Sequence, residues 1–301
     1  MPAAMRLDAE LVRRGLARSR RRAADLIEAG RVEVAGAVAT RPAQPVPPDA
    51  DVAVTGADRP DYVSRAAHKL VGALDALAAL APDAPSPAGS RCLDAGASTG
   101  GFTQVLLERG AARVAAVDVG HGQLDPAIAA DPRVDVHEGL NVRALRPEDV
   151  GGPVDLVVAD LSFISLTVAL PALLAATRPG GDLLVLVKPQ FEVGRARLGS
   201  SGVVRSPELR REAVAAVADA ALRLGAACRA VVPSPLPGPS GNREYFLWLV
   251  PAPAAGSGGV ADGVASEVAA SEVAAAEVVA AVAAAVRDDR AVLVAGEGGA
   301  P

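Results

Sequence analysis

Residues 62–250 alternate short apolar runs with helical stretches, and this alternation constrains the fold more than any other feature of the 301-residue chain. The runs that predict strands lie at 91–95, 113–118, 134–138, 154–160, 182–188, 227–233 and 243–250. Helical patterns fill most of the gaps, notably at 101–109, 166–177 and 207–224. Strands that alternate with helices predict an α/β fold with a parallel sheet covered on both faces.

Residues 1–61 follow a different pattern and predict a small α+β domain followed by a linker. Apolar residues of "RLDAELVRRGLARSRRRAADLIEAG" recur at helical spacing in two blocks, with Ser19 placed to cap the second block. "RVEVAGAVAT" then alternates as two strands joined by a turn would. Residues 41–61 are rich in Pro, Asp and Ala, which indicates one more short strand and a linker.

Arginines 18, 20, 21 and 22 cluster at the start of the second predicted helix. A solvated helix face is one explanation, but cations at a helix N-terminus oppose the macrodipole, so a phosphate partner accounts for them better. The chain's net charge of −5 does not argue against such a partner, because residues 251–301 alone hold 7 acidic and 2 basic side chains.

Residues 251–301 form a low-complexity Ala/Gly/Val/Glu tail. Glu267, Glu272 and Glu277 recur every five positions, so they drift around a helix and define no amphipathic stripe. We expect a partly helical or disordered extension without catalytic residues.

The chain shows no apolar run long enough for a membrane span and no secretory signal at its start. Cys92 and Cys228 lie in apolar runs without metal-ligand spacing, which indicates buried reduced thiols in a cytoplasmic protein. We therefore expect a cytoplasmic localisation, no metal, no membrane partner and no obligate protein partner.

The stretch "RCLDAGASTGGFTQVLLERG", residues 91–110, predicts a ligand-binding turn between a strand and a helix. Glycines in such a turn allow close backbone approach to a ligand, and the helix N-terminus offers free N–H groups. The next strand ends in Asp118, placed to accept hydrogen bonds from a ribose. The expected nucleotide-site residues of this stretch are Asp94, Gly96, Ser98, Gly100, Gly101 and Phe102.

Three interpretations of this turn compete. "GASTG" also fits the nucleophile elbow of a hydrolase, but the only histidines are at 68, 121 and 137, and none follows the acid as that fold requires. A dinucleotide site would need G-x-G-x-x-G, and position 98 is Ser. S-adenosylmethionine lacks phosphates and suits the turn better, with an acid such as Asp94 at its methionine end; Asp160 is also expected to contact the cofactor. Asn141 could reach the adenine, and an ordinary strand-to-helix turn is the alternative for that residue.

Lysine occurs at only two positions, Lys69 and Lys188, in a chain with 28 arginines. Lys188 ends one predicted strand and Asp160 ends another, where open α/β sheets bind ligands. Lys69 opens the helix before the first strand, and Glu244 opens the last strand. A desolvated lysine can act as a base whereas arginine stays protonated, so these four residues suit removal of a proton from a hydroxyl. Chance survival of two lysines is the alternative.

Two family resemblances are carried by these motifs. "RLD..LVRRGLA.SR..A..LIEAG.V.V.G" resembles the S4 RNA-binding domain, departing at "VAG", where that family often has Asn before the Gly. The run from "YVSRAAHKL" through "LDAGASTGGFTQVLLERGA", "VVADLSFISL", "LLVLVKPQFEVG" and "GNREYF" resembles the TlyA branch of FtsJ-type RNA methyltransferases. Together the two resemblances cover about residues 6–250.

The resemblance implies a Rossmann-like methyltransferase domain over 62–250 and S-adenosylmethionine as cofactor. It implies methylation of the ribose 2′-hydroxyl of cytidine in small- and large-subunit ribosomal RNA, so ribosomal RNA or ribosomal subunits would be the partners. The family's Lys-Asp-Lys-Glu tetrad falls on Lys69, Asp160, Lys188 and Glu244. The S4-like start implies RNA contacts, which we expect from Arg6, Arg18, Arg20, Arg21 and Arg22.

Other functions remain open at this stage. The fold could methylate a substrate other than RNA, or it could bind RNA without turnover as a ribosome-associated factor. Some members of the family carry a hemolysin label, to which we give little weight because nothing in the sequence predicts membrane insertion.

Overall fold

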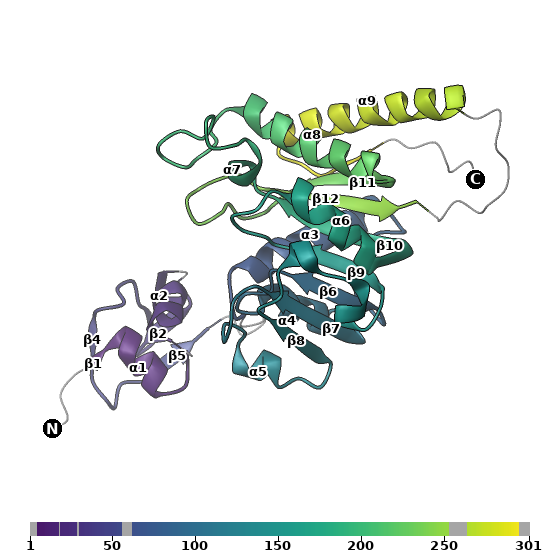
Figure 1. Ribbon diagram of the computed structural model, residues 1–301. Helices are drawn as coiled ribbons and strands as arrows, with labels where there is room; N and C mark the ends of the chain where they lie inside the picture. Colours follow the sequence, from purple (N-terminus) through teal and green to yellow (C-terminus); the bar gives the residue numbers. More distant parts are fainter. Residues whose placement is uncertain (1–4, 18, 29, 56–61, 253–263, 295–301) are drawn as a thin grey trace. The chain divides into compact units, whose positions relative to one another are not determined.

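The computed structural model describes residues 5–17, 19–28, 30–55, 62–252 and 264–294 (Figure 1). The chain divides into two compact units, Met1–Asp61 and Tyr62–Pro301. The S4 domain resemblance lies within the first unit, and all four residues of the expected tetrad lie within the second.

The N-terminal unit is a small α+β domain built on two helices. These are α1 (Leu7–Arg13) and α2 (Arg20–Glu28), and Ser19 Oγ accepts the backbone N–H of Arg22 (3.2 Å), as expected of a capping residue. Five short strands complete it: β1 (Met5–Arg6), β2 (Val32–Val34), β3 (Ala37–Val38), β4 (Pro45–Val46) and β5 (Val52–Val54). β1 pairs with β4, and β2 lies between β3 and β5.

The turn between β2 and β3 shows how "VAG" is accommodated. Ala35 and Gly36 both adopt positive φ, 51° and 78°, as the central residues of a two-residue hairpin turn do. Asn or Gly is the usual choice at such a position, so the alanine carries a small local strain.

The second unit is built on an eight-stranded sheet. The strands are β6 (Arg91–Ala95), β7 (Arg113–Asp118), β8 (Val134–Glu138), β9 (Val154–Ala159), β10 (Thr177–Val187), β11 (Ala226–Pro233), β12 (Tyr245–Pro251) and β13 (Val292–Leu293). Their order across the sheet is β13-β11-β12-β10-β9-β6-β7-β8. Five neighbouring strands of this sheet, in the order β10-β9-β6-β7-β8, are parallel to one another. This is the doubly wound, Rossmann-like order, which confirms the expected fold class.

The sheet is not parallel throughout, which differs from the expectation. β12 inserts between β10 and β11 and pairs antiparallel with both, and β13 pairs antiparallel with β11. Strands buried on both faces read as continuous apolar runs, so the letters of 243–250 do not reveal the direction in which that strand runs.

Helices cover both faces of the sheet. One face packs against α3 (Ala66–Leu80), α4 (Gly101–Glu108) and the short α5 (Pro126–Ala129). The other packs against α6 (Leu166–Ala176), α8 (Pro207–Arg223) and α9 (Val264–Asp288). The remaining elements, α7 (Pro189–Glu192) and the 3-10 turns η1 (Val142–Ala144) and η2 (Pro147–Val150), lie in the connections.

The tail differs from the expectation of an extension without an apolar stripe. Apolar side chains at 278, 281, 282, 285 and 286 are buried on one side of α9, in the same core cluster as α6 and α8. These positions follow the i, i+3, i+4, i+7 spacing of an amphipathic helix, and they begin just after the last of the recurring glutamates. Residues 264–294 are thus part of the second unit, where β13 also pairs with β11.

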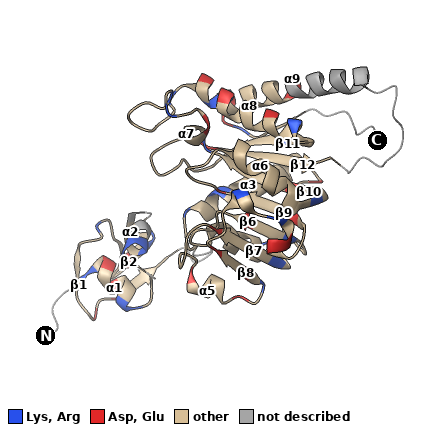
Figure 2. Ribbon diagram, viewed as in Figure 1, with Lys and Arg blue, Asp and Glu red and all other residues tan. Residues whose placement is uncertain are grey.

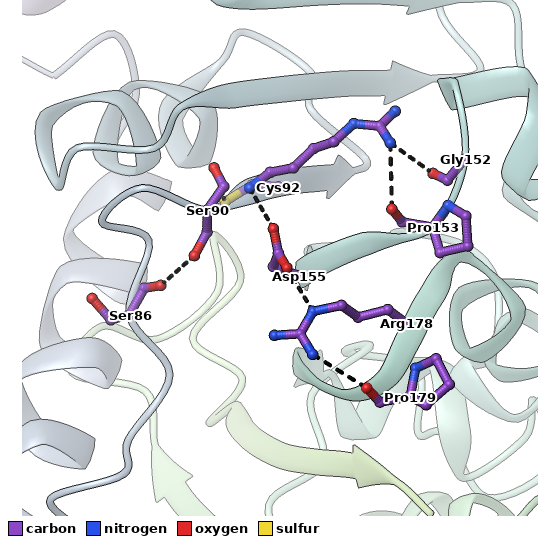
Figure 3. Close-up of polar contacts among 9 residues, drawn as sticks. Ser86, Ser90, Cys92, Gly152, Pro153, Asp155, Arg178 and Pro179 are labelled. Carbon is purple, nitrogen blue, oxygen red and sulfur yellow. Dashed lines mark hydrogen bonds and ion pairs between the residues drawn. The ribbon is translucent and has the colours of Figure 1, made fainter. Parts of the chain in front are cut away.

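Polar contacts tie together the N-terminal ends of the central strands, opposite the edge where ligands are expected (Figure 3). Asp155 accepts the backbone N–H of Arg91 (2.8 Å) and the Nε–H of Arg178 (2.5 Å). The Arg91 guanidinium donates to the carbonyl oxygens of Gly152 (3.2 Å) and Pro153 (3.3 Å). These bonds join neighbouring strands and loops, so the polar residues at this edge stabilise the sheet.

Candidate active site

The larger of two adjoining cavities lies where the strand order reverses, between the C-terminal ends of β6 and β9. Its volume is about 450 Å³. The walls include Gly96, Ser98, Asp118, Asn141 and Asp160, five of the residues expected to bind the cofactor. Doubly wound sheets bind ligands at this switch point, so the position of the cavity agrees with nucleotide binding.

The backbone of the glycine-rich turn makes room for this cavity. Gly96 has a φ of 86°, and a Cβ there would lie 2.8 Å from the carbonyl oxygen of Asp160. A Cβ on Gly101, the first residue of α4, would lie 2.2 Å from Ser64 Oγ. Ser98 is held at a positive φ of 47° between them. Glycine is therefore needed at 96, where the backbone of Asp160 approaches closely and φ is positive, whereas the nearest obstacle at 101 is the side-chain hydroxyl of Ser64.

Asp118 and Asn141 hold polar groups at the rim of the larger cavity. The two carboxylate oxygens of Asp118 accept the backbone N–H groups of Ser98 (2.8 Å) and Gly120 (2.7 Å), which fixes the carboxylate at the end of β7. Asn141 Oδ1 accepts the N–H of Arg143 (3.0 Å) at the start of η1, so the amide side chain is oriented by its carbonyl end. Each oxygen of Asp118 keeps a lone pair for further donors.

The structure places Asp94 in the core, on the wall of neither cavity. Its side chain is fully buried and accepts a hydrogen bond from Thr103 Oγ1 (2.7 Å), while its Oδ1 has no hydrogen-bond partner among the described residues. Burial raises the pKa of Asp94 to about 7, against the lowering effect of the Thr103 hydrogen bond. Gly100 likewise lines neither cavity, and a Cβ there would meet the side chains of Leu124 and Ile128.

A smaller cavity of about 270 Å³ holds both lysines of the chain. Lys69 comes from α3 and Lys188 from the end of β10, and their side chains are only 6% and 10% exposed. Gly101 and Phe102 also line this cavity, and the Phe102 ring stacks on Phe246 in the core. Four residues belong to the walls of both cavities: Gly96, Ser98, Asp160 and Ser162.

Each lysine is paired with a carboxylate. Lys69 Nζ lies 2.5 Å from Glu244 Oε2, and Lys188 Nζ lies 2.6 Å from Asp160 Oδ1. Glu244 is buried, and its second oxygen has no hydrogen-bond partner in the described part of the chain. The expected tetrad is therefore brought together as two ion pairs of zero net charge.

The antiparallel direction of β12 explains how Glu244 reaches this edge. Glu244 directly precedes β12, whose first residue, Tyr245, pairs with Val187 at the end of β10. An antiparallel strand begins where its parallel neighbours end. The departure from a parallel sheet thus brings Glu244 to the same edge as Lys188.

Sequence reasoning did not select Ser162, although it contacts Lys188 directly. Lys188 Nζ donates a hydrogen bond to Ser162 Oγ (2.9 Å). The Nζ–Oδ1 contact with Asp160 is close, but it lacks the alignment of a hydrogen bond. The ring of Phe191 lies 5.9 Å from the same ammonium. Two serines occur in "DLSFIS", and nothing in the sequence indicates which of them contacts the lysine.

Glu192 fastens the loop after β10 to the start of α6. Its two oxygens accept hydrogen bonds from Ser165 Oγ (2.5 Å) and from the backbone N–H of Leu166 (2.9 Å). Burial raises the pKa of Glu192, against the lowering effect of these two bonds. The loop that carries Lys188 is therefore anchored to the loop that carries Asp160.

Phe163 is a second residue that sequence reasoning missed. It is 92% exposed, adopts a positive φ of 65°, and lines the larger cavity. Its ring lies 5.3 Å from that of Phe191. An exposed aromatic ring in a strained backbone conformation beside a cavity is typical of a stacking surface. The signal available in the sequence was an aromatic residue, rare in this chain, in the loop directly after a strand.

Three of the expected RNA-binding arginines, Arg20, Arg21 and Arg22, open α2, where Figure 2 shows basic residues, and Arg6 lies in β1. Arg6 and Arg20 converge on the buried carboxylate of Asp8, at 2.8 and 3.1 Å, with side chains 51% and 60% exposed. Arg21 is exposed and Arg22 is partly buried. Arg18 lies outside the described residues. The side of the guanidinium groups that faces solvent remains available to an anion.

The described residues contain no group of three or more potential metal ligands. No helix among them is both long and apolar enough to cross a membrane. Both cysteines are buried and unbridged.

Comparison with known proteins places the chain in a family. The model of FtsJ-like methyltransferases matches residues 62–250, and that of the S4 domain matches residues 5–52. The 16S/23S rRNA (cytidine-2′-O)-methyltransferase TlyA of Mycobacterium tuberculosis is 57% identical over 244 residues, which is 81% of this chain and 89% of that protein.

Two further relatives carry the hemolysin name. Hemolysin A of Brachyspira hyodysenteriae is 35% identical over 82% of this chain and 100% of its own length. A solved structure of a Streptococcus thermophilus protein that carries the name hemolysin superposes with a TM-score of 0.65 at 30% identity, over 96% of this chain and 98% of that one. These matches confirm the resemblance stated from the motifs: the chain belongs to the TlyA family of FtsJ-like methyltransferases, with an S4 domain ahead of the methyltransferase domain.

Proposed function

We propose that this protein uses S-adenosylmethionine to methylate the ribose 2′-hydroxyl of cytidine in ribosomal RNA. The observation that carries the proposal is the adjoining pair of cavities: one suits a nucleoside cofactor, and the other holds two buried lysine–carboxylate pairs. The 57% identical relative, whose name gives this activity, supports the substrate. A cytoplasmic site of action follows from that substrate.

The larger cavity fits the cofactor. Asp118 has lone pairs for the two ribose hydroxyls, and Asn141 lies on the same wall with its amide nitrogen available to a ring nitrogen. Val119, Leu140 and Ile164 supply apolar wall for an adenine. Gly96 gives the close approach that the methionine portion needs. We assign the cofactor to these residues.

The smaller cavity performs the proton chemistry. S-adenosylmethionine in the larger cavity would supply an electrophilic methyl group on its sulfur. After Lys188 has lost its own proton to solvent, its uncharged amine accepts the proton of the ribose 2′-hydroxyl. The O–H bond breaks and the O–C bond forms as the methyl–sulfur bond breaks, and S-adenosylhomocysteine leaves. Asp160 stabilises the resulting ammonium group. The Lys69–Glu244 pair fixes a second cation in the cavity, where it can attract the nucleotide's phosphate.

The N-terminal unit supplies RNA affinity. Its arginines are held by buried carboxylates but remain exposed, so they can contact phosphates without sequence preference. With only seven aromatic residues in the chain, most RNA contact must come from arginines and backbone.

Transfer of a labelled methyl group tests the proposal. The full-length protein is incubated with methyl-labelled S-adenosylmethionine and either free ribosomal RNA or ribosomal subunits. A 2′-O-methyl group blocks alkaline cleavage of the adjoining phosphodiester, so the labelled nucleotide is mapped as a cleavage-resistant cytidine. Lys188→Ala should abolish transfer while keeping cofactor affinity within about threefold, and Arg113→Ala, which removes an exposed cation paired with Asp135, serves as the matched control.

Two outcomes would overturn the proposed function, and a third would overturn only the role of Lys188. Label on a base or on protein would mean a different methyl acceptor. RNA binding without any transfer would identify a non-catalytic factor. Full activity of Lys188→Ala would leave the reaction in place but remove the residue assigned to the proton.

A further inference from the structure

Two loops meet at the edge of the sheet where the tetrad lies. The loop after β9 carries Asp160, Ser162 and Ser165, and the loop after β10 carries Lys188 and Glu192. Side-chain contacts join the two loops: Lys188 contacts Asp160 and Ser162, and Glu192 accepts a hydrogen bond from Ser165. The mechanism above uses Asp160 and Lys188, and the Glu192–Ser165 bond anchors the loops, but Ser162 has no assigned role.

We propose that Ser162 is a positioning residue that aims the amine of Lys188 at the substrate hydroxyl. This inference rests on the proposed function, since it concerns the base of that reaction. It divides the work around Lys188 between two neighbours: Asp160 provides charge, and Ser162 provides direction.

The contacts of Lys188 support this division. Asp160 Oδ1 lies 2.6 Å from Nζ but does not accept a hydrogen bond, so its attraction has little angular preference. Ser162 Oγ, at 2.9 Å, is the one described acceptor of a hydrogen bond from Nζ. Hydrogen bonds weaken steeply away from linearity, so this bond fixes the rotation of the terminal amine.

Direction matters because an uncharged amine has a single lone pair. Rotation about the Cε–Nζ bond sweeps that lone pair around a cone, and only one rotamer faces the hydroxyl. One N–H held on Ser162 leaves a restricted set of directions for the other N–H and the lone pair. Ser162 lines both cavities, so these remaining directions lie at the boundary between cofactor and acceptor. A correctly aimed base is worth far more than one that must reorient in each turnover.

A purely structural role for Ser162 finds no support in its contacts. Among the described residues its hydroxyl makes no hydrogen bond to backbone and caps no helix, and the residue is exposed. Ser165, three positions later, does the opposite: it caps α6 and donates to Glu192, with no contact to Lys188. The two serines of one loop thus form a matched pair for experiment.

The test compares Ser162→Ala with Ser165→Ala in the full-length protein, using the labelled-methyl assay on ribosomal RNA. Ser162→Ala should lower kcat roughly 10- to 100-fold, the effect of losing a hydrogen bond to a charged group. Its KM for RNA and Kd for S-adenosylmethionine should stay within about twofold, and its melting temperature should not change. Ser162→Thr keeps a hydroxyl and should recover most of the lost kcat.

Ser165→Ala should show the reverse behaviour. It loses a helix cap, so its melting temperature should fall. Glu192 keeps its hydrogen bond from the N–H of Leu166, so the two loops stay joined and kcat should stay within about threefold of the wild type. A Ser162→Ala variant with a lowered kcat/KM but an unchanged kcat would overturn the inference. An equal loss of kcat in both serine variants would also overturn it, as would a Ser162→Thr variant that recovers no kcat. If the wild-type protein transfers no methyl group to ribose, the proposed function itself fails, which is a distinct result.

Discussion

Both units of this protein bury carboxylates against cations, but they choose different cations. In the N-terminal unit, Asp8 is paired with Arg6 and Arg20, whose guanidinium groups remain largely in solvent. In the methyltransferase unit, Asp160 and Glu244 are paired with lysines that are almost fully enclosed. The chain places no lysine anywhere else.

The difference follows from what each cation must do. Arginine keeps its charge and presents a flat fork of donors, which suits the recognition of phosphate. Lysine can exist as an uncharged amine, which suits a group that accepts a proton. The carboxylates orient the cations in both units, so the identity of the cation separates binding from chemistry.

Replacing Lys188 by arginine, the cation that the N-terminal unit uses, should have the largest effect. Lys188→Arg keeps the positive charge beside Asp160 but removes the capacity to accept a proton. We expect kcat to fall by about 10³, within the range that general-base catalysis contributes, with cofactor Kd changed by less than about threefold. Single-turnover methyl transfer measures this. A variant with more than about a tenth of wild-type activity would show that Lys188 acts through its charge alone.

Asp94 differs from the paired carboxylates of both units because it is buried with no cation beside it. Its pKa is raised to about 7 by burial, so the folded protein retains a proton that the unfolded chain loses near pH 4. The folded state therefore binds more protons between about pH 4 and 7, and stability falls as pH rises through that window.

Asp94→Asn should remove this pH dependence. Compared with the wild type, the variant should gain stability as pH rises from 5 to 8, by as much as a few kcal/mol. Urea unfolding of both proteins at the two pH values, without cofactor, measures the gain. A stability difference that is the same at pH 5 and pH 8 would mean that Asp94 does not hold a proton in the folded state.

Asp8 tests the arginine-paired side. The hydrogen bond from Arg6 lowers the pKa of Asp8 to about 2, so its stabilising effect should be complete above pH 4 and lost as pH falls from about 4 to 2. Asp8→Ala should destabilise α1 by about 1–2 kcal/mol at pH 7, a modest value because the arginine heads are exposed. Hydrogen exchange of the α1 amides in the full-length protein measures this, and unchanged protection would show that the cluster contributes nothing to stability.

Removal of one exposed arginine should have the smallest effect. Arg21→Ala should weaken RNA binding about 3- to 10-fold and reduce the slope of log affinity against log salt by nearly one, without changing kcat at saturating RNA. Arg113→Ala, in the methyltransferase unit, is the control and should leave the slope unchanged. A loss of kcat in Arg21→Ala would contradict the separation of binding from chemistry.

The sequence allowed much of this arrangement to be predicted, because strand ends and glycine turns are local signals. Asp160 and Lys188 were selected as polar residues that end apolar runs, and the parallel sheet brings such ends to one edge. Lys69 was selected by its rarity and by the family's tetrad, and its contact with Glu244 depends on the direction of β12. That direction is set by packing across the sheet, which leaves no mark in an apolar run.

Other features could not be predicted because they depend on contacts between distant segments. Ser162 and Ser165 have the same chemistry and lie in one loop, and only the approach of the β10 loop distinguishes them. The packing of α9 was missed for another reason. The glutamates at 267, 272 and 277 obscured the apolar stripe that follows them, and β13 gains its place only from its partner β11.

Gly96 has a consequence for how the two halves of the reaction are coupled. It borders both cavities, and a single added carbon there would strike the backbone of Asp160. The main chain at Gly96 therefore borders both the proposed donor site and the proposed acceptor site. A larger residue at position 96 would push two strand ends apart and disturb both sites at once, whereas a side-chain substitution in one cavity need not reach the other.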